Sequence, residues 1–351
     1  MGSKKVALMV NLGSPDSTAK KDVRKYLDEF LMDERVIDLA YWKRVLLIRG
    51  IILNFRPGKS AKAYRKIWWD EGSPLIVISE RLQEKVANRT EFPVYLAMRY
   101  GNPSIEDVLL KIKEENPFVE EILLIPLYPH YAMSSYETVE VKVRESLKLM
   151  SHQVGLKVMP PFYNSKEYIK LLADKIANHN PDQYDQVLFS YHGIPERHVR
   201  KTDPSGGHCL KVDNCCEVPH PCQKFCYRHQ TLKMTELING ELQLAEDKVA
   251  SSFQSRLGND PWLQPFTDKR LEALPDEGVK KLLIVCPAFV SDCLETLEEI
   301  EMEGQEEFLE NGGEAFKMVP CLNDDDEWAE LLAKWINEFE PEISLSETNT
   351  F

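Results

Sequence analysis

Short apolar runs along the chain alternate with longer segments in which apolar residues recur every three or four positions. The runs are rich in Val, Leu and Ile and predict strands, whereas the periodic segments predict amphipathic helices. We expect strands at 6–11, 94–98, 121–127, 156–159, 187–191, 249–254, 281–286 and 316–319. We expect helices at 20–31, 75–88, 105–115, 166–177, 230–242, 292–309 and 327–339.

This alternation predicts an α/β fold with mostly parallel sheets covered by helices. The pattern runs twice, so we expect two domains, 1–165 and 166–339, with the final helix packing back across them. An irregular segment rich in Cys, His, Gly and Pro interrupts the second domain at 202–227, and 340–351 is expected to be a flexible tail. Ligands of such sheets bind at the carboxyl ends of strands. No glycine-rich nucleotide motif follows the first strand.

The longest apolar stretch is "VLLIRGIILNF" at 45–55, within a segment at 40–60. It falls short of the roughly 18 apolar residues that a membrane helix needs. One interpretation is a core or lid helix. The other is an apolar lip that contacts a hydrophobic ligand or the membrane surface, so peripheral membrane contact is expected at most.

The net charge of −14 limits the kinds of partner that we expect. It argues against a nucleic-acid partner and disfavours binding to anionic lipid by charge alone. No signal peptide is visible at the N-terminus, which favours a cytoplasmic location.

Five of the eight cysteines lie between 209 and 226. A secreted disulfide framework spreads its cysteines through a small chain, so this grouping favours a reducing compartment and a local metal or cluster site. The spacing is not the C-x2-C pairing of a zinc ribbon. Four thiolates suffice for a 2Fe–2S cluster. Tetrahedral zinc with His208 or His220 is the nearest alternative, and free or disulfide-bonded cysteines are the third.

Four carboxylates share one face of the helix predicted at 292–309. Asp292, Glu295, Glu299 and Glu303 fall within about 80° of one another around an α-helix. An acidic surface face is one interpretation, because the first turn of a helix favours carboxylates. A relay for protons or a hard divalent cation is the other. His192, just past a strand in the same half, favours the relay, because an imidazole exchanges protons near neutral pH.

Seven motifs in order resemble the ferrochelatase family over about residues 5–335. They are "VNLGSPDSTAKKDVRKYLDEFLMDERVID", "EGSPL", "MRYGNPSI", "PLYPHYAMSS", "SYHGIPERH", "SRLGNDPWLQPFTD" and "PAFVSDCLETLEEIEMEG". The resemblance implies two Rossmann-like domains with four-stranded sheets and a porphyrin cleft. It implies insertion of Fe2+ into protoporphyrin IX to form protohaem, with two protons released.

The resemblance also implies site residues. The catalytic pair falls on His192 and Glu295, which would also contact the Fe2+ substrate, and the relay on Asp292, Glu299 and Glu303. The porphyrin cleft falls on Leu12, Arg99, Tyr100, Tyr128, Tyr191, Trp262 and Cys293. Many family members carry histidine where this chain has Cys293, so a metal path through a second imidazole is in doubt.

The animal-type cluster site of this family is absent, because Met133 replaces its first cysteine and no cysteine follows Cys321. Some bacterial members instead bear a cluster within an insert after the histidine motif. That resemblance implies four 2Fe–2S ligands, with Cys222 as the possible substitute: Cys209, Cys215, Cys216 and Cys226. Its role would be structural or sensory, since metal insertion transfers no electrons.

Several alternatives stay open from the sequence. Coproporphyrin could replace protoporphyrin as substrate. A cobalt or nickel chelatase would share the two-domain plan, and a non-catalytic haem or iron–sulfur carrier would use the cleft only for binding. A monomer is favoured, because nothing in the sequence implies the dimer of the animal enzymes.

Overall fold

A computed structural model of the chain describes residues 3–258 and 260–338. The predicted tail at 340–351 lies outside these residues. The chain forms two compact units. The first contains the described parts of Met1–Leu127, Ser134–Pro160 and Asp324–Phe351, and the second contains Tyr128–Met133 and the described parts of Pro161–Asn323.

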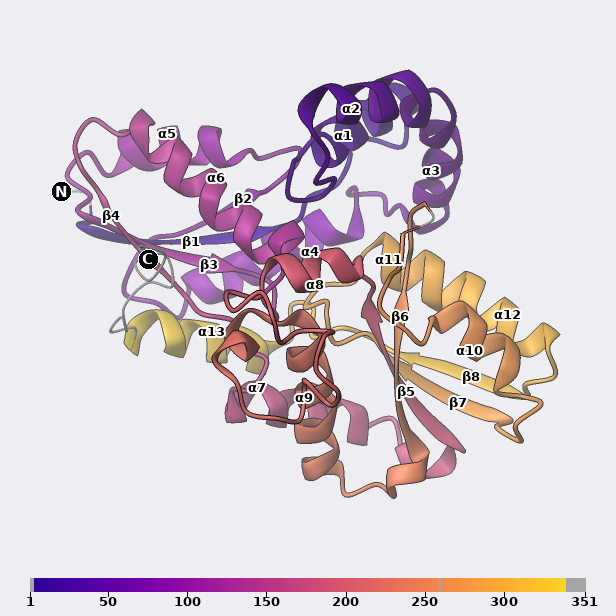
Figure 1. Cartoon of the computed structure of the whole chain (residues 1–351). Helices are drawn as coiled ribbons and strands as arrows, with labels where there is room; N and C mark the ends of the chain where they lie inside the picture. Colours follow the sequence, from indigo (N-terminus) through magenta and orange to yellow (C-terminus); the bar gives the residue numbers. More distant parts are fainter. Residues whose placement is uncertain (1–2, 259, 339–351) are drawn as a thin grey trace. The chain divides into compact units, whose positions relative to one another are not determined.

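The first unit is built on a four-stranded parallel sheet. Its strands, in spatial order, are β2 (Val94–Met98), β1 (Lys5–Asn11), β3 (Glu121–Pro126) and β4 (Gly155–Val158). Helices cover both faces: α5 (Ile105–Glu115) and α6 (Thr138–Ser146) lie on one, and α4 (Pro74–Ala87) and α13 (Asp326–Glu338) on the other (Figure 1). The central strand β1 is therefore apolar and buried along nearly its whole length, as a doubly covered parallel strand should be.

The second unit repeats this plan with another four-stranded parallel sheet. Its strands, in spatial order, are β6 (Val249–Gln254), β5 (Gln186–His192), β7 (Lys281–Val285) and β8 (Ala315–Val319). One face carries α7 (Lys166–Ala177) and α9 (Tyr227–Leu242), and the other carries α10 (Thr267–Ala273) and α12 (Gln305–Glu310) (Figure 1). On the second face Leu188, Leu271, Phe308 and Phe316 pack into one apolar core. The predicted α/β class with parallel sheets is confirmed.

The apolar stretch at 45–55 belongs to a longer helical segment of the first unit. It comprises α2 (Tyr41–Leu47), the π-helical turn η1 (Ile48–Ile52) and α3 (Leu53–Ile67), and it follows α1 (Lys20–Leu31). Ile48 and Leu53 are buried, whereas Trp42, Leu46 and Phe55 are exposed. The segment thus has an inner core face and an outer apolar face.

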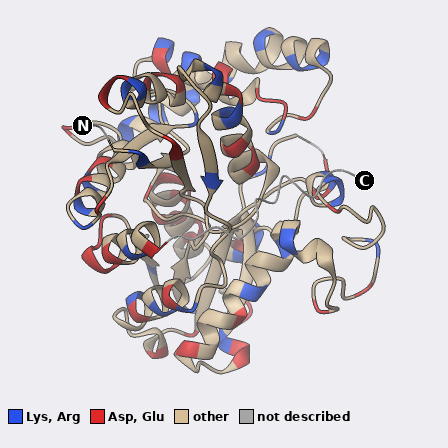
Figure 2. Ribbon diagram, turned by 90° about the vertical axis from the view of Figure 1, so that its left-hand side faces the viewer, with Lys and Arg blue, Asp and Glu red and all other residues tan. Residues whose placement is uncertain are grey.

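The last helix, α13, belongs to the first unit although it follows the second in sequence. The Lys85 ammonium on α4 lies 3.3 Å from the Asp324 carboxylate just before α13, and Arg89 lies 3.1 Å from Asp326. Among the described residues, no helix is long and apolar enough to cross a membrane. Acidic and basic residues occur on helices throughout the chain (Figure 2).

The segment at 202–227 has little regular structure. After the short helix α8 (Glu196–Lys201) it runs through turns to one 3-10 turn, η5 (Pro221–Phe225), and then enters α9. Asp203 holds its start, because one carboxylate oxygen accepts the backbone N–H groups of His208 and Cys209, each at 2.9 Å. We call this segment the insert.

Candidate active site

His192 is the last residue of β5, at the carboxyl end of the second sheet. Its Nδ1 lies 2.7 Å from the carbonyl oxygen of Gly193, so Nδ1–H donates there and Nε2 keeps its lone pair. Burial lowers the pKa of His192, and the negative charge of Glu295 opposes that shift only in part. The imidazole is therefore neutral at neutral pH and presents Nε2 as a proton acceptor.

Two neighbouring strand ends meet tightly at Gly193. Its N–H donates to the carbonyl of Gln254, the last residue of β6, over 2.6 Å. A Cβ at this position would lie 2.7 Å from the carbonyl oxygen of Ser255 and 2.9 Å from that of Gln254. Only glycine fits without moving the backbone, which explains the glycine after the histidine.

Gln254 is a site residue that the sequence analysis missed. Its buried amide donates to the carbonyl of Glu295 over 2.9 Å and accepts the Ser190 hydroxyl at 2.8 Å. One side chain thus ties strand β5 to the helix that carries the second candidate catalytic residue. The available signal was a glutamine ending an otherwise small and apolar strand.

The helical segment after β7 is less regular than predicted. It begins with a short turn, α11 (Leu294–Thr296), and continues as the π-helix η7 (Leu297–Gly304) before α12. The helix predicted from 292 begins slightly later, because Cys293 occupies the N-cap position and exchanges hydrogen bonds with Thr296. In a π-helix the backbone bonds span five residues, which the α-helical spacing argument did not anticipate.

Asp292 is buried and held in place. Its carboxylate accepts the Asn323 side-chain amide at 2.7 Å, the Thr296 hydroxyl at 3.0 Å and the Cys321 backbone N–H at 3.3 Å. These bonds satisfy both oxygens, so Asp292 fixes the start of the segment.

The exposure to solvent of the other three carboxylates increases along the segment. Glu295 and Glu299 are half-buried, and Glu303 is exposed. Burial raises the pKa of Glu299 to about 7, although the Ser255 hydroxyl, which donates to its Oε2 over 2.6 Å, favours the ionised form. Glu299 can therefore gain and lose a proton near neutral pH.

The aromatic side chains of the second unit differ in their contacts, and one of them packs against His192. Phe289, which the sequence analysis missed, lies edge-on to the imidazole with ring centroids 6.2 Å apart. Trp262 is half-buried, and its indole N–H donates to the carbonyl of Leu257 over 3.1 Å. Tyr191 is fully buried and its hydroxyl is 2.8 Å from that of Thr235. The other two cleft candidates of this unit differ, since Cys293 is buried and Tyr128 half-buried.

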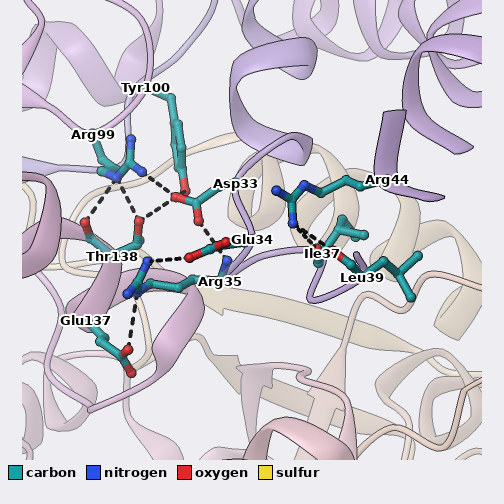
Figure 3. A network of polar contacts seen from close by, with 10 residues as sticks. All are labelled: Asp33, Glu34, Arg35, Ile37, Leu39, Arg44, Arg99, Tyr100, Glu137 and Thr138. Carbon is teal, nitrogen blue, oxygen red and sulfur yellow. Dashed lines mark hydrogen bonds and ion pairs between the residues drawn. The ribbon is translucent and has the colours of Figure 1, made fainter. Parts of the chain in front are cut away.

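The cleft candidates of the first unit lie at the ends of β1 and β2. Leu12 is half-buried directly after β1, and its carbonyl accepts the N–H of Tyr100 over 2.9 Å. Arg99 is not a free cation: it forms an ion pair with Asp33 and its Nε donates to the Thr138 hydroxyl over 2.8 Å (Figure 3). The Tyr100 hydroxyl donates to the same carboxylate over 3.0 Å.

This network is nearly sealed from water, with side-chain exposures of 11% for Arg99 and 5% for Asp33. Burial alone would raise the pKa of Asp33, but the Thr138 hydrogen bond and the Arg99 charge outweigh it, so the pKa is lowered. Beside it, Arg35 pairs with Glu137 at 3.2 Å (Figure 3). The network joins the loop after α1 to the end of β2 and the start of α6.

The five thiols of the insert form one group. Cys209 and Cys222 have their sulfur atoms 3.4 Å apart, and Cys226 is hydrogen-bonded with both Cys209 and Cys216. Cys216 in turn contacts Cys215. All are buried except Cys216, which is half-buried. This set of converging soft donors fits a thiolate-bound metal or cluster.

Further donors stand at one side of this group. His208 and His220 stack with ring centroids 4.1 Å apart, and with Cys222 they could hold a metal ion. The His208 Nε2 is 2.8 Å from the carbonyl of Cys215. A mixed thiolate and imidazole site therefore stays an alternative to four thiolates.

Comparisons with known proteins extend to nearly the whole chain. A model of the ferrochelatase family matches residues 4–340. The ferrochelatase of Opitutus terrae is 50% identical over 332 residues, which are 94% of this chain and 96% of that protein. The ferrochelatase of Azotobacter vinelandii is 50% identical over 329 residues, 93% of this chain and 96% of that protein. That of Pseudomonas syringae pv. tomato is 48% identical over 326 residues, with 93% and 95% covered.

A solved structure shares the fold at low sequence similarity. The structure described as SirB from Bacillus subtilis with Fe3+ has a TM-score of 0.52 and 12% identity, covering 96% of each chain. At that identity the likeness concerns the fold alone.

Proposed function

The chain belongs to the ferrochelatase family and is a metal chelatase, and from this we propose that it inserts Fe2+ into protoporphyrin IX. Two pyrrole N–H protons leave as the four ring nitrogens bind the metal. Iron is the substrate and keeps its oxidation state, so the protein must supply a shaped site and a proton acceptor. The observation that carries the proposal is His192, neutral and held in one tautomer beside Glu295.

In the proposed mechanism Nε2 of His192 accepts the pyrrole protons. Glu295 stabilises the imidazolium that forms, because its charge already favours the protonated ring. Glu299 and the exposed Glu303 then carry protons outward, which the graded burial and the pKa of Glu299 near 7 support. Asp292 holds the start of this segment. His192 and Glu295 would also be the first contacts of the arriving metal.

For the macrocycle we propose apolar and aromatic contacts. Leu12, Tyr128 and Trp262 are half-buried and suited to line it, and Phe289 is added because it stands against His192. The remaining candidates, being buried or nearly so, would support that lining from behind: Arg99, Tyr100, Tyr191 and Cys293.

For the insert we propose a 2Fe–2S cluster bound by Cys209, Cys215, Cys216 and Cys226, with Cys222 as the substitute. The grouping of the five thiols supports ligation, and the contact of Cys222 with Cys209 keeps the substitution open. When bound, such a cluster would cross-link the insert.

We also propose peripheral contact with an anionic membrane through the segment α2–η1–α3. Although the whole chain is acidic, residues 41–69 carry eight basic residues and no Asp or Glu. Four exposed cations recur every third residue along α3, at Arg56, Lys59, Lys62 and Arg65. They accompany exposed Trp42, Leu46, Ile51 and Phe55. Basic and apolar side chains on one surface helix favour anionic lipid headgroups.

The decisive experiment follows haem formation directly. Anaerobically purified protein is mixed with protoporphyrin IX and Fe2+, and the visible spectrum is recorded over time, with coproporphyrin in a parallel cuvette. We expect catalytic conversion of protoporphyrin. His192→Ala should lose it by at least 100-fold, the range of a general base, while porphyrin fluorescence still reports binding.

Other outcomes would change the proposal. Faster conversion of coproporphyrin would identify coproporphyrin as the substrate and would leave the proposed chelatase activity unchanged. Binding without turnover in the parent protein would favour a haem or porphyrin carrier. Near-normal turnover in His192→Ala would remove His192 from its role.

A further inference from the structure

Tyr227 connects the insert to the candidate base. It is the first residue of α9, and its hydroxyl donates to the main-chain carbonyl of His192 over 2.8 Å. The side chain is 6% exposed, so this bond is shielded from competing water. His192 and Tyr227 belong to the same unit, and the bond joins positions 35 residues apart in the sequence.

The bonded carbonyl is well placed to control the imidazole. It belongs to the peptide that joins His192 to Gly193, and the next carbonyl, that of Gly193, accepts Nδ1–H of the same ring at 2.7 Å. The N–H of that peptide is held by Gln254 at 2.6 Å. A tilt of this peptide would move the Gly193 carbonyl and turn the ring with it.

The tyrosine ring is itself fixed by packing. It meets the buried His130 ring edge-on, with centroids 5.6 Å apart, and Tyr191 meets the same ring at 5.5 Å. Tyr191, which precedes His192 in the strand, and Tyr227, which is hydrogen-bonded to it, therefore pack on the same ring. The Tyr227 hydroxyl cannot shift far without disturbing that packing.

The residues next to Tyr227 in the sequence contact the thiols of the insert. Cys226 is the N-cap of α9, and its sulfur accepts the N–H of His229 over 3.5 Å. Arg228 donates to the sulfur of Cys216 over 3.3 Å. One helical turn therefore carries a candidate cluster ligand, a cation on a second thiol and the hydroxyl that holds His192.

We propose that Tyr227 is a positioning residue for metal insertion, whose hydroxyl fixes the His192 peptide and so ties the orientation of the base to the thiol-lined insert. The inference rests on the proposed function of His192 as proton acceptor. Tyr227 itself touches neither substrate nor the reacting atoms. Its effect is expected in the rate of the chemical step and in the environment of the imidazole.

The test removes only the hydroxyl. Tyr227→Phe is compared with Tyr163→Phe, a matched control because Tyr163 stacks on the same His130 ring, at 6.2 Å, and has no hydrogen bond to His192 among the described contacts. Four quantities are measured: kcat, the porphyrin KM, the visible spectrum of the insert, and the 13Cε1 signal of His192 in histidine-labelled protein. His192→Ala assigns that signal.

In Tyr227→Phe we expect kcat to fall about tenfold, with KM within twofold, because a misdirected base weakens the transition state rather than binding. The His192 signal should move while the insert spectrum is retained, and Tyr163→Phe should match the parent. Unchanged kcat with an unmoved His192 signal in Tyr227→Phe would overturn the proposal. An equal loss in Tyr163→Phe would also overturn it, by assigning the effect to ring packing. If the parent protein lacks chelatase activity, the proposed function fails, and the His192 signal alone decides whether Tyr227 holds the peptide.

Discussion

The hydroxyl of Ser255 donates to Oε2 of Glu299 over 2.6 Å, joining the residue after β6 to the π-helix η7. This bond stabilises the ionised carboxylate, and burial opposes it more strongly, which leaves the pKa of Glu299 at about 7. Glu299 can relay a proton only when ionised, so relay capacity should rise with pH through neutrality.

The first prediction concerns the pH profile of turnover. We expect kcat to rise between pH 6 and 8 with a midpoint near 7, and Glu299→Gln to be slower and to lack that midpoint. Ser255→Ala removes a hydrogen bond that favours ionisation, so its midpoint should shift upward. Glu310→Gln, an exposed change on α12, is the control. A Glu299→Gln profile with the parent's midpoint would exclude this carboxylate from the relay.

The second prediction concerns stability and follows from the same shift. A carboxyl whose pKa is raised on folding binds protons more tightly in the folded state, so the free energy of unfolding falls as pH rises from about 4.5 to 7. At pH 8 Glu299→Gln should therefore be more stable than the parent by about 1–3 kcal/mol, and at pH 5 the two should be similar. Urea unfolding at both pH values measures this. Equal stability at pH 8 would contradict the raised pKa.

The third prediction concerns the sealed ion pair of the first unit. Asp33→Ala leaves the Arg99 cation buried without its partner, which should lower the free energy of unfolding by about 3–5 kcal/mol. Asp174→Ala breaks the exposed pair with Lys170 and should cost less than about 1 kcal/mol. Denaturant titration of both variants makes the comparison. Similar losses would show that burial does not govern the Asp33 pair.

The fourth prediction concerns the membrane. The parent protein should sediment with vesicles that contain phosphatidylglycerol and bind weakly to pure phosphatidylcholine. Lys59→Glu with Lys62→Glu should weaken that binding by more than about 30-fold, since each lost lysine contributes about 1 kcal/mol near an anionic surface and each new glutamate is repelled by it. The same double reversal at Lys111 and Lys170 is the control. If the control weakens binding equally, net charge and not this segment is responsible.

The fifth prediction concerns the insert. Iron analysis of anaerobically purified protein should give about two irons per chain, with visible absorption of the 2Fe–2S type. Cys209→Ser and Cys226→Ser should lose both, whereas Cys222→Ser retains them. Cys321→Ser, a buried cysteine outside the insert, is the control. Zinc in place of iron, lost in His220→Ala, would favour the mixed thiolate and imidazole site.

The strands show what local pattern can predict. The range 94–98 agrees with β2, because a buried parallel strand is a continuous apolar run ended by turn residues. The range 249–254 agrees with β6, although Ser251 and Ser252 interrupt its apolar residues. Helix α6 was not predicted, since Val139, Val141 and Val143 alternate with polar residues and imitate a strand. Its packing against the sheet overrides that local preference.

The site shows where local pattern stops. The relay of four carboxylates could be proposed from helical spacing, and His192 could be proposed from its place at a strand end. The roles of Gln254 and Ser255 depend on hydrogen bonds across about 41 and 44 residues of sequence, which no local rule reports. The departure from α-helical geometry at 297–304 was also missed, because residue propensities do not distinguish π-helices from α-helices.

The π-helical turn Leu297–Gly304 has a consequence for how this protein can change. Its wider backbone bonds are poorer than those of an α-helix, so deleting one residue there would let the segment relax into a regular helix and gain stability. The same deletion would shift Glu299 within the segment and away from its hydrogen bond with Ser255. Selection for thermostability alone would thus disrupt the placement of the carboxylates. A laboratory variant stabilised by converting this π-helix to an α-helix should be a well-folded but slow enzyme.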